Sequence, residues 1–586
     1  MADLLTMLSE RLAPAFDAVA GEAGVDPVVR PSDRADAQAN GALPLAKRLG
    51  RNPREVAEAV VSALQQDGGL EGVASVEVAG PGFLNLHVEA VFLAGALAAM
   101  AADERLGVPT QPAKRVVVDY SAPNVAKQMH IGHLRSTVIG DALVRMLAFF
   151  GHDVVRENHI GDWGRPFGIH IENLIERGVL DAAELDIDEL DRNYKESTQR
   201  FRAEPDFAER ARQRVVKLQR RDPETMAIWN RLVETTEAYW TDLYGKLGVL
   251  LTNDDVVGES FYDQLLPSVV ERLGVAGLLE HSDGADVVFP PGFTNREGEP
   301  LPLIVRTTAG AYTYATSDLA CVIDRVERVK ADLMLYVVGA DQGLHLAMVF
   351  AASRMAGWLQ APTEAWHIGF GNVLGPDRTK LRSRSGDPVS FAHVVDDAID
   401  RGIAAVAEKN PHLAGEERTR IGHAVGIGAL KYADLSTDRV RDYIFDWDRM
   451  LSFDGNTAPY LQYAHTRICS IFRRAVGPDG SPDSAVERGE ARMVTPAIVE
   501  AAERTLAIRL LGYEAALVET VERYSPHRLC TYLYELADAF TTFYEHCPVL
   551  RADATQKASR LALCDLTGRV LAHGLGLLGI EAPEQM

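Results

Sequence analysis

Two patterns of apolar residues alternate along the first hundred residues. Helical spacing predicts helices at the start of the chain and over residues 53–66 and 90–102. Apolar and polar side chains alternate over residues 74–88, as in strands with one buried face, and Gly80-Pro81-Gly82 interrupts this stretch. The two prolines of residues 106–113 then indicate a linker. The pattern predicts a small, separate α/β module.

A second module opens with a continuous strand predicted at residues 115–121. Its valine run suits a strand buried on both faces of a parallel sheet. Apolar side chains then recur at three- and four-residue steps over residues 131–150, and Gly151 lies where a helix-ending glycine is expected. A strand is predicted next, over residues 152–160. Strand, helix and strand in this order are typical of a doubly wound nucleotide-binding sheet.

The rest of the chain contains an insertion and a long helical region. Residues 181–247 are charged and helical, and the sheet pattern returns at residues 301–305 and 333–339. From about residue 396 to the C-terminus, almost every segment has the pattern of an amphipathic helix. The predicted fold class is α/β, with a Rossmann-type parallel-sheet catalytic domain, an N-terminal α+β module and a C-terminal all-α bundle.

Composition sets the general class of the protein. A chain of 586 residues is too long for one hydrophobic core, so about three or four domains are expected. With 47% apolar residues and no apolar run of membrane length, the chain is expected to be cytoplasmic, without a membrane span or signal peptide. The five cysteines are scattered, which favours reduced thiols over a disulfide framework or a zinc site. The net charge of −23 weakens non-specific attraction to phosphates without forbidding a local basic surface.

The motif His130-Ile131-Gly132-His133 lies where the first strand of the second module has turned into its helix. A helix N-terminus offers free amides and the positive end of a dipole, so it attracts phosphate. The two imidazoles, three residues apart, share one face of the first turn. Gly132 leaves room for an adenine ring to lie against the backbone. We therefore expect His130 and His133 to stabilise charge that develops on the phosphates of ATP.

Motifs along nearly the whole chain resemble the arginyl-tRNA synthetases, a class I family. The matching segments occur in the same order as in that family: 119–137, 158–164, 312–318, 442–448, 455–467 and 578–586. The resemblance implies activation of L-arginine with ATP to arginyl-adenylate, and transfer of arginine to the 3′ end of its tRNA. It also implies Mg²⁺ on the triphosphate, tRNA needed for activation, and a monomer.

The resemblance extends to an arginine pocket. A guanidinium requires carboxylates held in a fixed geometry, and Tyr314 and Asp318, four residues apart, share one helical face. Asp318 is expected to bind the guanidinium, and Tyr314 to bond or cover it. Asn124 and Gln342 match residues that contact the bound amino acid. Asp119, at the end of the first strand, is a candidate second carboxylate.

The second ATP motif departs from the family pattern. Class I synthetases carry a KMSKS loop, and here the stretch begins Lys380-Leu381-Arg382 and continues with Ser383 and Arg384. Ser383 therefore stands in place of a lysine. In some arginyl enzymes a lysine just ahead of the HIGH histidines compensates, and Lys127 stands at that position. We expect Lys127, Lys380 and Arg384 to act together on the triphosphate.

Further positions resemble residues that contact tRNA. Aromatic stacking combined with arginine contacts is a common way to bind unpaired bases. The anticodon-loop set is Tyr460, Arg467, Tyr544 and Met586, and the set for the outer corner of the tRNA is Phe83 and Asn85.

The expected domains are residues 1–110, a tRNA-corner module; 111–395, the catalytic domain, with an insertion at about 180–300; 396–450, a helical connector; and 451–586, the anticodon-binding domain. Three alternatives were weighed. A cysteinyl-tRNA synthetase would need a zinc-ligating cysteine near Asp119, which the chain lacks. A nucleotidyltransferase would be shorter and lack the bundle. A non-catalytic paralogue would not need the intact motif residues.

Overall fold

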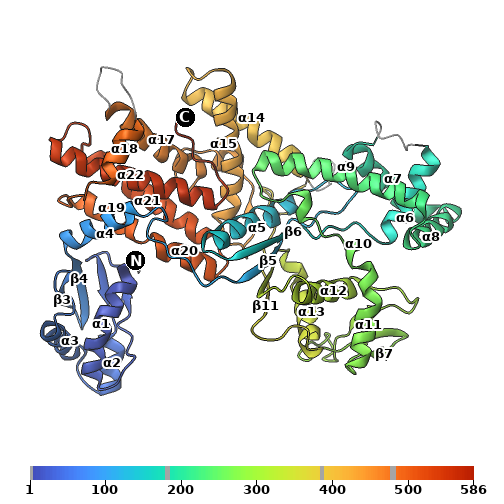
Figure 1. Ribbon diagram of the computed structural model, residues 1–586, viewed down its shortest axis with the longest axis horizontal. Coiled ribbons are helices and arrows are strands. Elements are labelled where there is room, and N and C mark those ends of the chain that lie inside the picture. Colours follow the sequence, from blue (N-terminus) through green and yellow to red (C-terminus); the bar gives the residue numbers. More distant parts are fainter. Residues whose placement is uncertain (1–3, 179–184, 383–388, 476–483) are drawn as a thin grey trace.

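The chain forms an N-terminal module, a central parallel sheet with a helical insertion, and a large helical bundle (Figure 1). The computed structural model describes residues 4–178, 185–382, 389–475 and 484–586, without the side chains of residues 484–487. The N-terminal module and the insertion lie at opposite ends of the molecule, with the sheet between them (Figure 1).

The N-terminal module is an antiparallel sheet covered by helices, as its apolar pattern predicts. The strand order is β1-β2-β4-β3. Its elements are α1 (Leu4–Ala20), β1 (Val29–Arg30), β2 (Ala37–Ala39), α2 (Ala42–Leu49), α3 (Pro53–Asp67), β3 (Ala74–Ala79), β4 (Phe83–Val88) and α4 (Ala90–Ala102). Asn52 caps α3 by accepting a hydrogen bond from the backbone N–H of Arg54, and Gly68 ends the helix in the left-handed conformation. Alternation of apolar and polar residues over β3 and β4 therefore sets this small sheet by local pattern alone.

The central sheet is parallel, with strand order β11-β10-β5-β6. It comprises β5 (Arg115–Asp119), β6 (Asp153–Glu157), β10 (Leu333–Tyr336) and β11 (Glu364–His367). Val116, Val117 and Val118 are fully buried, which confirms the two-sided burial predicted for β5. The helix after β5 is α5 (Ile131–Phe149). Because β5 leads to β6 on one side while β10 lies on its other side, the strand order reverses between β5 and β10, where ligands bind in such folds.

One predicted strand belongs to a different sheet. Residues 301–305 were expected to extend the parallel sheet, but β9 (Leu303–Arg306) instead pairs antiparallel with β8 (Ala285–Val288), which pairs with β7 (Glu280–Ser282). An apolar run does not by itself specify its partner strand. Helices and turns complete this region: η1 (Asn253–Asp255), α10 (Glu259–Tyr262), η2 (Asp263–Leu265), α11 (Leu266–Val275), α12 (Tyr314–Glu327), η3 (Ala340–Gln342) and α13 (Gly343–Met355).

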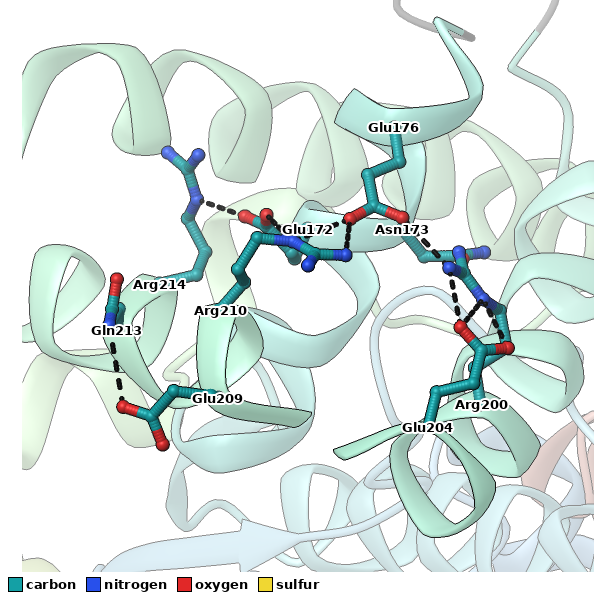
Figure 2. Close-up of polar contacts among 9 residues, drawn as sticks. All are labelled: Glu172, Asn173, Glu176, Arg200, Glu204, Glu209, Arg210, Gln213 and Arg214. Carbon is teal, nitrogen blue, oxygen red and sulfur yellow. Dashed lines mark hydrogen bonds and ion pairs between the residues drawn. The ribbon is translucent and has the colours of Figure 1, made fainter. Parts of the chain in front are cut away.

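The insertion is a helical layer that combines apolar packing with ion pairs. It contains α6 (Arg165–Arg177), α7 (Ile187–Ala203), α8 (Pro205–Gln219) and α9 (Pro223–Leu247). Figure 2 shows arginines of α7 and α8 reaching carboxylates of α6, with Arg214 Nε 3.0 Å from Glu172 Oε2 and Arg200 Nη2 2.9 Å from Glu176 Oε2. Ile169, Phe207 and Ala211 form a small apolar cluster between α6 and α8, while Ile171, Leu190, Leu218, Leu232 and Trp240 join the insertion to the main hydrophobic core. Ion pairs on the surface of the insertion thus supplement an apolar interior.

The C-terminal part is almost entirely helical. Its elements are β12 (Val373–Leu374), α14 (Phe391–Lys409), α15 (Gly415–Leu435), β13 (Tyr443–Ile444), α16 (Trp447–Met450), α17 (Ala458–Ala475), α18 (Ser484–Arg492), α19 (Ala501–Leu511), α20 (Tyr513–Glu522), α21 (His527–His546) and α22 (Ala554–Leu577). The bundle holds the N-terminal module through packing of α4 on α19 and an ion pair between Arg504 and Asp36. The five cysteines are free and buried. Among the described helices, none combines the length and apolar character needed to cross a bilayer.

Candidate active site and tRNA-binding surface

The HxGH motif forms the first turn of α5. His130 is the N-cap, and its Nδ1 accepts a hydrogen bond of 3.1 Å from the backbone N–H of Gly132. Nδ1 of His133 accepts one of 3.0 Å from the backbone N–H of His130. The two rings lie 4.1 Å apart, centroid to centroid. A side chain at position 132 would place its Cβ 2.8 Å from the His130 ring, so glycine is required here by the histidine itself.

These hydrogen bonds fix the protons of both imidazoles. A nitrogen that accepts from a backbone N–H carries no proton, so in each neutral ring the proton lies on Nε2. The His130 carbonyl is also 3.2 Å from Nδ1 of His133, a longer contact that would need the opposite tautomer. Burial, followed by the charge of His130, lowers the pKa of His133 to about 3. Both rings thus offer neutral Nε2–H donors to a ligand at the end of the helix.

Lys127 and Lys380 both lie beside the histidine turn. Their charges add to burial in lowering the pKa of His130. Lys380 is exposed in a hairpin in which it pairs with Leu374, and Ser390 pairs with His130. The segments before and after the KMSKS-like stretch therefore flank the histidines. Arg384 and Ser383 lie outside the described residues.

The loop between β5 and α5 carries Asn124 in a constrained backbone. Ser121, Ala122 and Ala126 have positive φ values of 73°, 48° and 61°, a region that costs energy for residues other than glycine. Helix α9 supports the loop: Thr236 accepts a hydrogen bond of 3.1 Å from the backbone N–H of Ala126. The insertion thus helps to hold this loop, which its sequence does not indicate.

Asn124 is exposed and lies on the backbone of Gly161. Its Oδ1 would be 2.2 Å from a Cβ at position 161, so any side chain larger than glycine there would displace Asn124 from this position. The backbone carbonyl of Gly161 accepts a hydrogen bond of 2.9 Å from Val125 N–H. The 158–164 segment is thereby joined to the loop that precedes the histidines.

Tyr314 and Asp318 lie one turn apart at the start of α12, with Tyr314 71% exposed. Glu259, at the start of α10, belongs to the same pocket: burial, then the charges of Asp162 and Asp318, raise its pKa to about 8. Burial and the charge of Glu259 also raise the pKa of Tyr314. These carboxylates form an acidic pocket suited to a cation. Sequence reasoning missed Glu259, because no local motif marks it.

Asp119 lies beside an arginine of the protein's own chain. It is 4% exposed, and its Oδ2 lies 2.8 Å from Nη2 of Arg325, whose guanidinium also binds Glu157 on the neighbouring strand. Its Oδ1 has no hydrogen-bond partner among the described residues, and binding of substrate arginine by Asp119 stays a prediction. The buried cluster fixes α12 to the ends of β5 and β6.

Tyr194 of α7 joins the two halves of the site. Nζ of Lys127 lies 5.2 Å from the centre of its ring, and the Tyr194 hydroxyl also contributes to the raised pKa of Tyr314. The phosphate-side lysine and the acidic pocket therefore meet at one side chain of the insertion. Gln342 is exposed in η3, after β10, next to the point where the strand order reverses.

The bundle contains a second, basic site. A cavity of about 940 Å³ is lined by aromatic and arginine side chains together with the C-terminal residue: Tyr463, Arg467, Arg473, Arg474, Tyr544, Arg551 and Met586. The Arg467 guanidinium lies 5.0 Å from the Tyr463 ring and 5.2 Å from the Tyr544 ring. An acidic chain thus has a local cationic, aromatic pocket. Tyr463 was not among the predicted tRNA-binding residues, although it lies four residues before Arg467 and therefore on the same face of the helix.

Tyr460 and Asn85, which are predicted to contact tRNA, each lie beside another side chain of the protein. Tyr460 is outside the cavity lining, and its hydroxyl lies 3.3 Å from that of Thr541, one turn before Tyr544. In the N-terminal module, Phe83 is half-buried, whereas Asn85 is 7% exposed and accepts a hydrogen bond of 2.7 Å from Gln38 Nε2. Asn85 is therefore held in place by Gln38, and its contact with tRNA stays a prediction.

A histidine pair at the reversal point of a parallel sheet, followed by a helical bundle, defines a class I aminoacyl-tRNA synthetase. Three family models match the chain: the class I (R) tRNA synthetase catalytic domain over residues 96–447, the DALR anticodon-binding domain over 461–586, and the arginyl-tRNA synthetase N-terminal domain over 2–88.

Among the described residues, no group of three His, Cys, Asp or Glu side chains is placed to hold a metal ion.

Whole-chain relatives specify the family. The arginine–tRNA ligase of Thermobifida fusca is 50% identical over all of both chains, and that of Escherichia coli O127:H6 is 44% identical over all of both chains. The solved arginyl-tRNA synthetase of Thermus thermophilus superimposes with a TM-score of 0.79 at 26% identity, over 99% of this chain and all of the other. The Plasmodium falciparum enzyme shares the fold, with a TM-score of 0.84 at 24% identity over all of both chains. The chain belongs to the arginyl-tRNA synthetase family.

Proposed function

We propose that the site on α5, α10 and α12 carries out the arginine–tRNA ligase reaction of this family with the following division of roles. ATP is a substrate. A carboxylate oxygen of arginine attacks the α-phosphorus, and pyrophosphate leaves. The terminal ribose hydroxyl of tRNA then attacks the arginyl carbonyl, and AMP leaves. The observation that supports the proposal is that Lys127 and Tyr314 both lie near Tyr194, which places the proposed phosphate-binding turn close to the proposed guanidinium site.

The side chains of the site are proposed to have the following roles. His130 and His133 donate Nε2–H groups to the phosphates, and Lys127, Lys380 and Arg384 offset the charge of the triphosphate. Asp318, Glu259 and Tyr314 bind the guanidinium, while Asn124 and Gln342 bind the α-amino and carboxylate groups. Gly132 permits close approach of the nucleotide. Mg²⁺ enters on the triphosphate, as it usually does when substrate phosphates supply most of its ligands.

The cavity at Arg467 and Tyr544 is proposed to bind bases of the anticodon loop by stacking and cationic contact. Met586 lies at its edge, where its carbonyl accepts a hydrogen bond of 3.2 Å from Asn410 Nδ2. Tyr460 supports the same surface through α21. The N-terminal module, with Phe83 and Asn85, contacts the outer corner of the tRNA. We further propose that the domain boundaries lie at residues 110, 395 and 450. The protein is proposed to be a monomer and to be cytoplasmic.

The test of this assignment is exchange of radiolabelled pyrophosphate into ATP, with tRNA present and each amino acid supplied in turn. Arginine alone is expected to support exchange, because only a guanidinium presents several N–H donors and a positive charge to the acidic groups of the site. Omission of tRNA is the matched control and is expected to lower the rate. Exchange supported by another amino acid would overturn the substrate assignment.

Lys127→Ala is expected to slow arginine-dependent exchange by about 10- to 100-fold, because it removes a cation beside the phosphates. The KM for arginine should change little, since Lys127 lies on the phosphate side. The measurement is kcat of exchange at saturating arginine and ATP. Lys195→Ala is the control: Lys195 follows Tyr194 on α7 and is 55% exposed beside Asp191. Equal kcat in Lys127→Ala and wild type would refute the compensating role of Lys127.

A further inference from the structure

The carboxylate of Asp318 is hydrogen-bonded on one side to a histidine outside the residues assigned to the reaction. Oδ2 of Asp318 lies 2.5 Å from Nε2 of His345, in the first turn of α13. No residue in the described ranges donates a hydrogen bond to Oδ1. The side chains are 25% and 32% exposed, so the pair borders the pocket rather than the core. One carboxylate oxygen is therefore fixed, and the other is available to a ligand.

Asp318 is the hydrogen-bond partner of His345, and the other titratable groups nearby belong to the elements packed around this pair. Glu259 and Asp162 lie on the α10 side of Asp318, and Glu259 adds negative charge there only above its raised pKa of about 8. On the β11 side, the ring of His367 lies against Gly343, and its Nε2 contacts the carbonyls of Val338 and Gly339 rather than His345. Asp341 is exposed in η3.

The hydrogen bond to Asp318 raises the pKa of His345 above its ordinary value of about 6.5. Asp318 is the one ionisable group of the described residues that contributes to this rise.

We propose that His345 is a positioning residue of the arginine pocket: it orients Asp318 through Oδ2, and its protonation state sets how strongly Asp318 attracts the guanidinium. The proposal rests on the role assigned to Asp318 above. Neutral His345 donates Nε2–H and leaves Asp318 its full charge. Protonated His345 brings a positive charge of its own, which offsets that charge and opposes a second cation. Arginine affinity should therefore rise as the pH increases through the titration of His345.

The experiment compares His345→Ala with His345→Gln in tRNA-dependent exchange. The glutamine amide can donate to Asp318 from about the position of Nε2, but it does not titrate in this range. His345→Ala is expected to raise the KM for arginine about tenfold, with kcat changed by less than about twofold, because the guanidinium lies away from the reacting carboxylate. His345→Gln should restore a KM within about twofold of wild type at high pH.

The pH profile separates orientation from charge. KM for arginine is measured from pH 6 to pH 8.5 in wild type and His345→Gln. Glu259 and the substrate amino group titrate in both proteins, so the ratio of the two KM values isolates His345. Because the histidine is protonated at low pH, the wild-type KM should be several-fold higher than that of His345→Gln at pH 6, and about equal at pH 8.5.

His281→Ala is the matched control, because His281 also pairs with an aspartate, Asp286, at 3.2 Å, on the separate β7–β8 hairpin. Its KM should equal that of wild type. An unchanged KM in His345→Ala, or identical pH profiles for wild type and His345→Gln, would overturn the proposal. If Asp318→Asn raises KM while His345→Ala does not, only the role of His345 fails. If Asp318→Asn leaves KM unchanged, the assignment of the pocket fails.

Discussion

His133→Asn lowers kcat for arginine-dependent pyrophosphate exchange by about 10²- to 10³-fold, the usual effect of removing one donor to a transition-state charge. The asparagine oxygen can still accept the backbone N–H of His130, so the helix cap is kept while the Nε2–H donor is lost. Because burial keeps the pKa of His133 at about 3, the lost group is a neutral donor and not a cation. KM for arginine should stay near that of wild type.

The control for this prediction is His133→Gln, whose longer amide places a donor closer to the position of Nε2. It should recover part of the lost rate, and both variants should unfold at temperatures close to that of wild type. Rate constants are measured at saturating ATP and arginine, with tRNA present. A kcat for His133→Asn equal to the wild-type value would exclude His133 as a phosphate donor.

Asp318→Asn is expected to lower kcat/KM for arginine by roughly 30- to 700-fold, which corresponds to about 2–4 kcal/mol for loss of a charged partner in a partly desolvated pocket. The loss should fall mainly on KM, because the guanidinium is bound equally in the ground state and the transition state. The amide would also turn an N–H donor or a neutral oxygen toward a cation. Steady-state exchange kinetics over a wide range of arginine concentration give the two constants separately.

Asp324→Asn is the control, since Asp324 lies on the same helix, is 6% exposed and pairs with Arg328 at 2.6 Å. The Asp324→Asn variant should have the wild-type KM for arginine even if the protein becomes less stable. A wild-type KM in Asp318→Asn would show that the guanidinium binds elsewhere, and Glu259 would then be the next residue to replace.

Sequence alone determined the features that depend on neighbours along the chain. Alternation over β3 and β4, the valine run of β5 and the three-residue step of His130 and His133 specify two strands, a buried strand and a phosphate-facing turn. The collinear motifs also identified the family, which the whole-chain relatives confirm. The strands and the turn depend on signals within a few residues, and the family resemblance depends on the order of short motifs along the chain, so neither needs knowledge of the tertiary fold.

Tertiary structure decided which distant groups meet. Asp119 ends the expected strand, and its partner is Arg325, 206 residues away. Glu259 lies near Asp318 although it belongs to another helix, and β9 joined a separate sheet. Charge and hydrogen-bonding capacity are properties of a residue, but whether a carboxylate is neutralised inside the protein or left for a ligand depends on which side chains the fold places beside it.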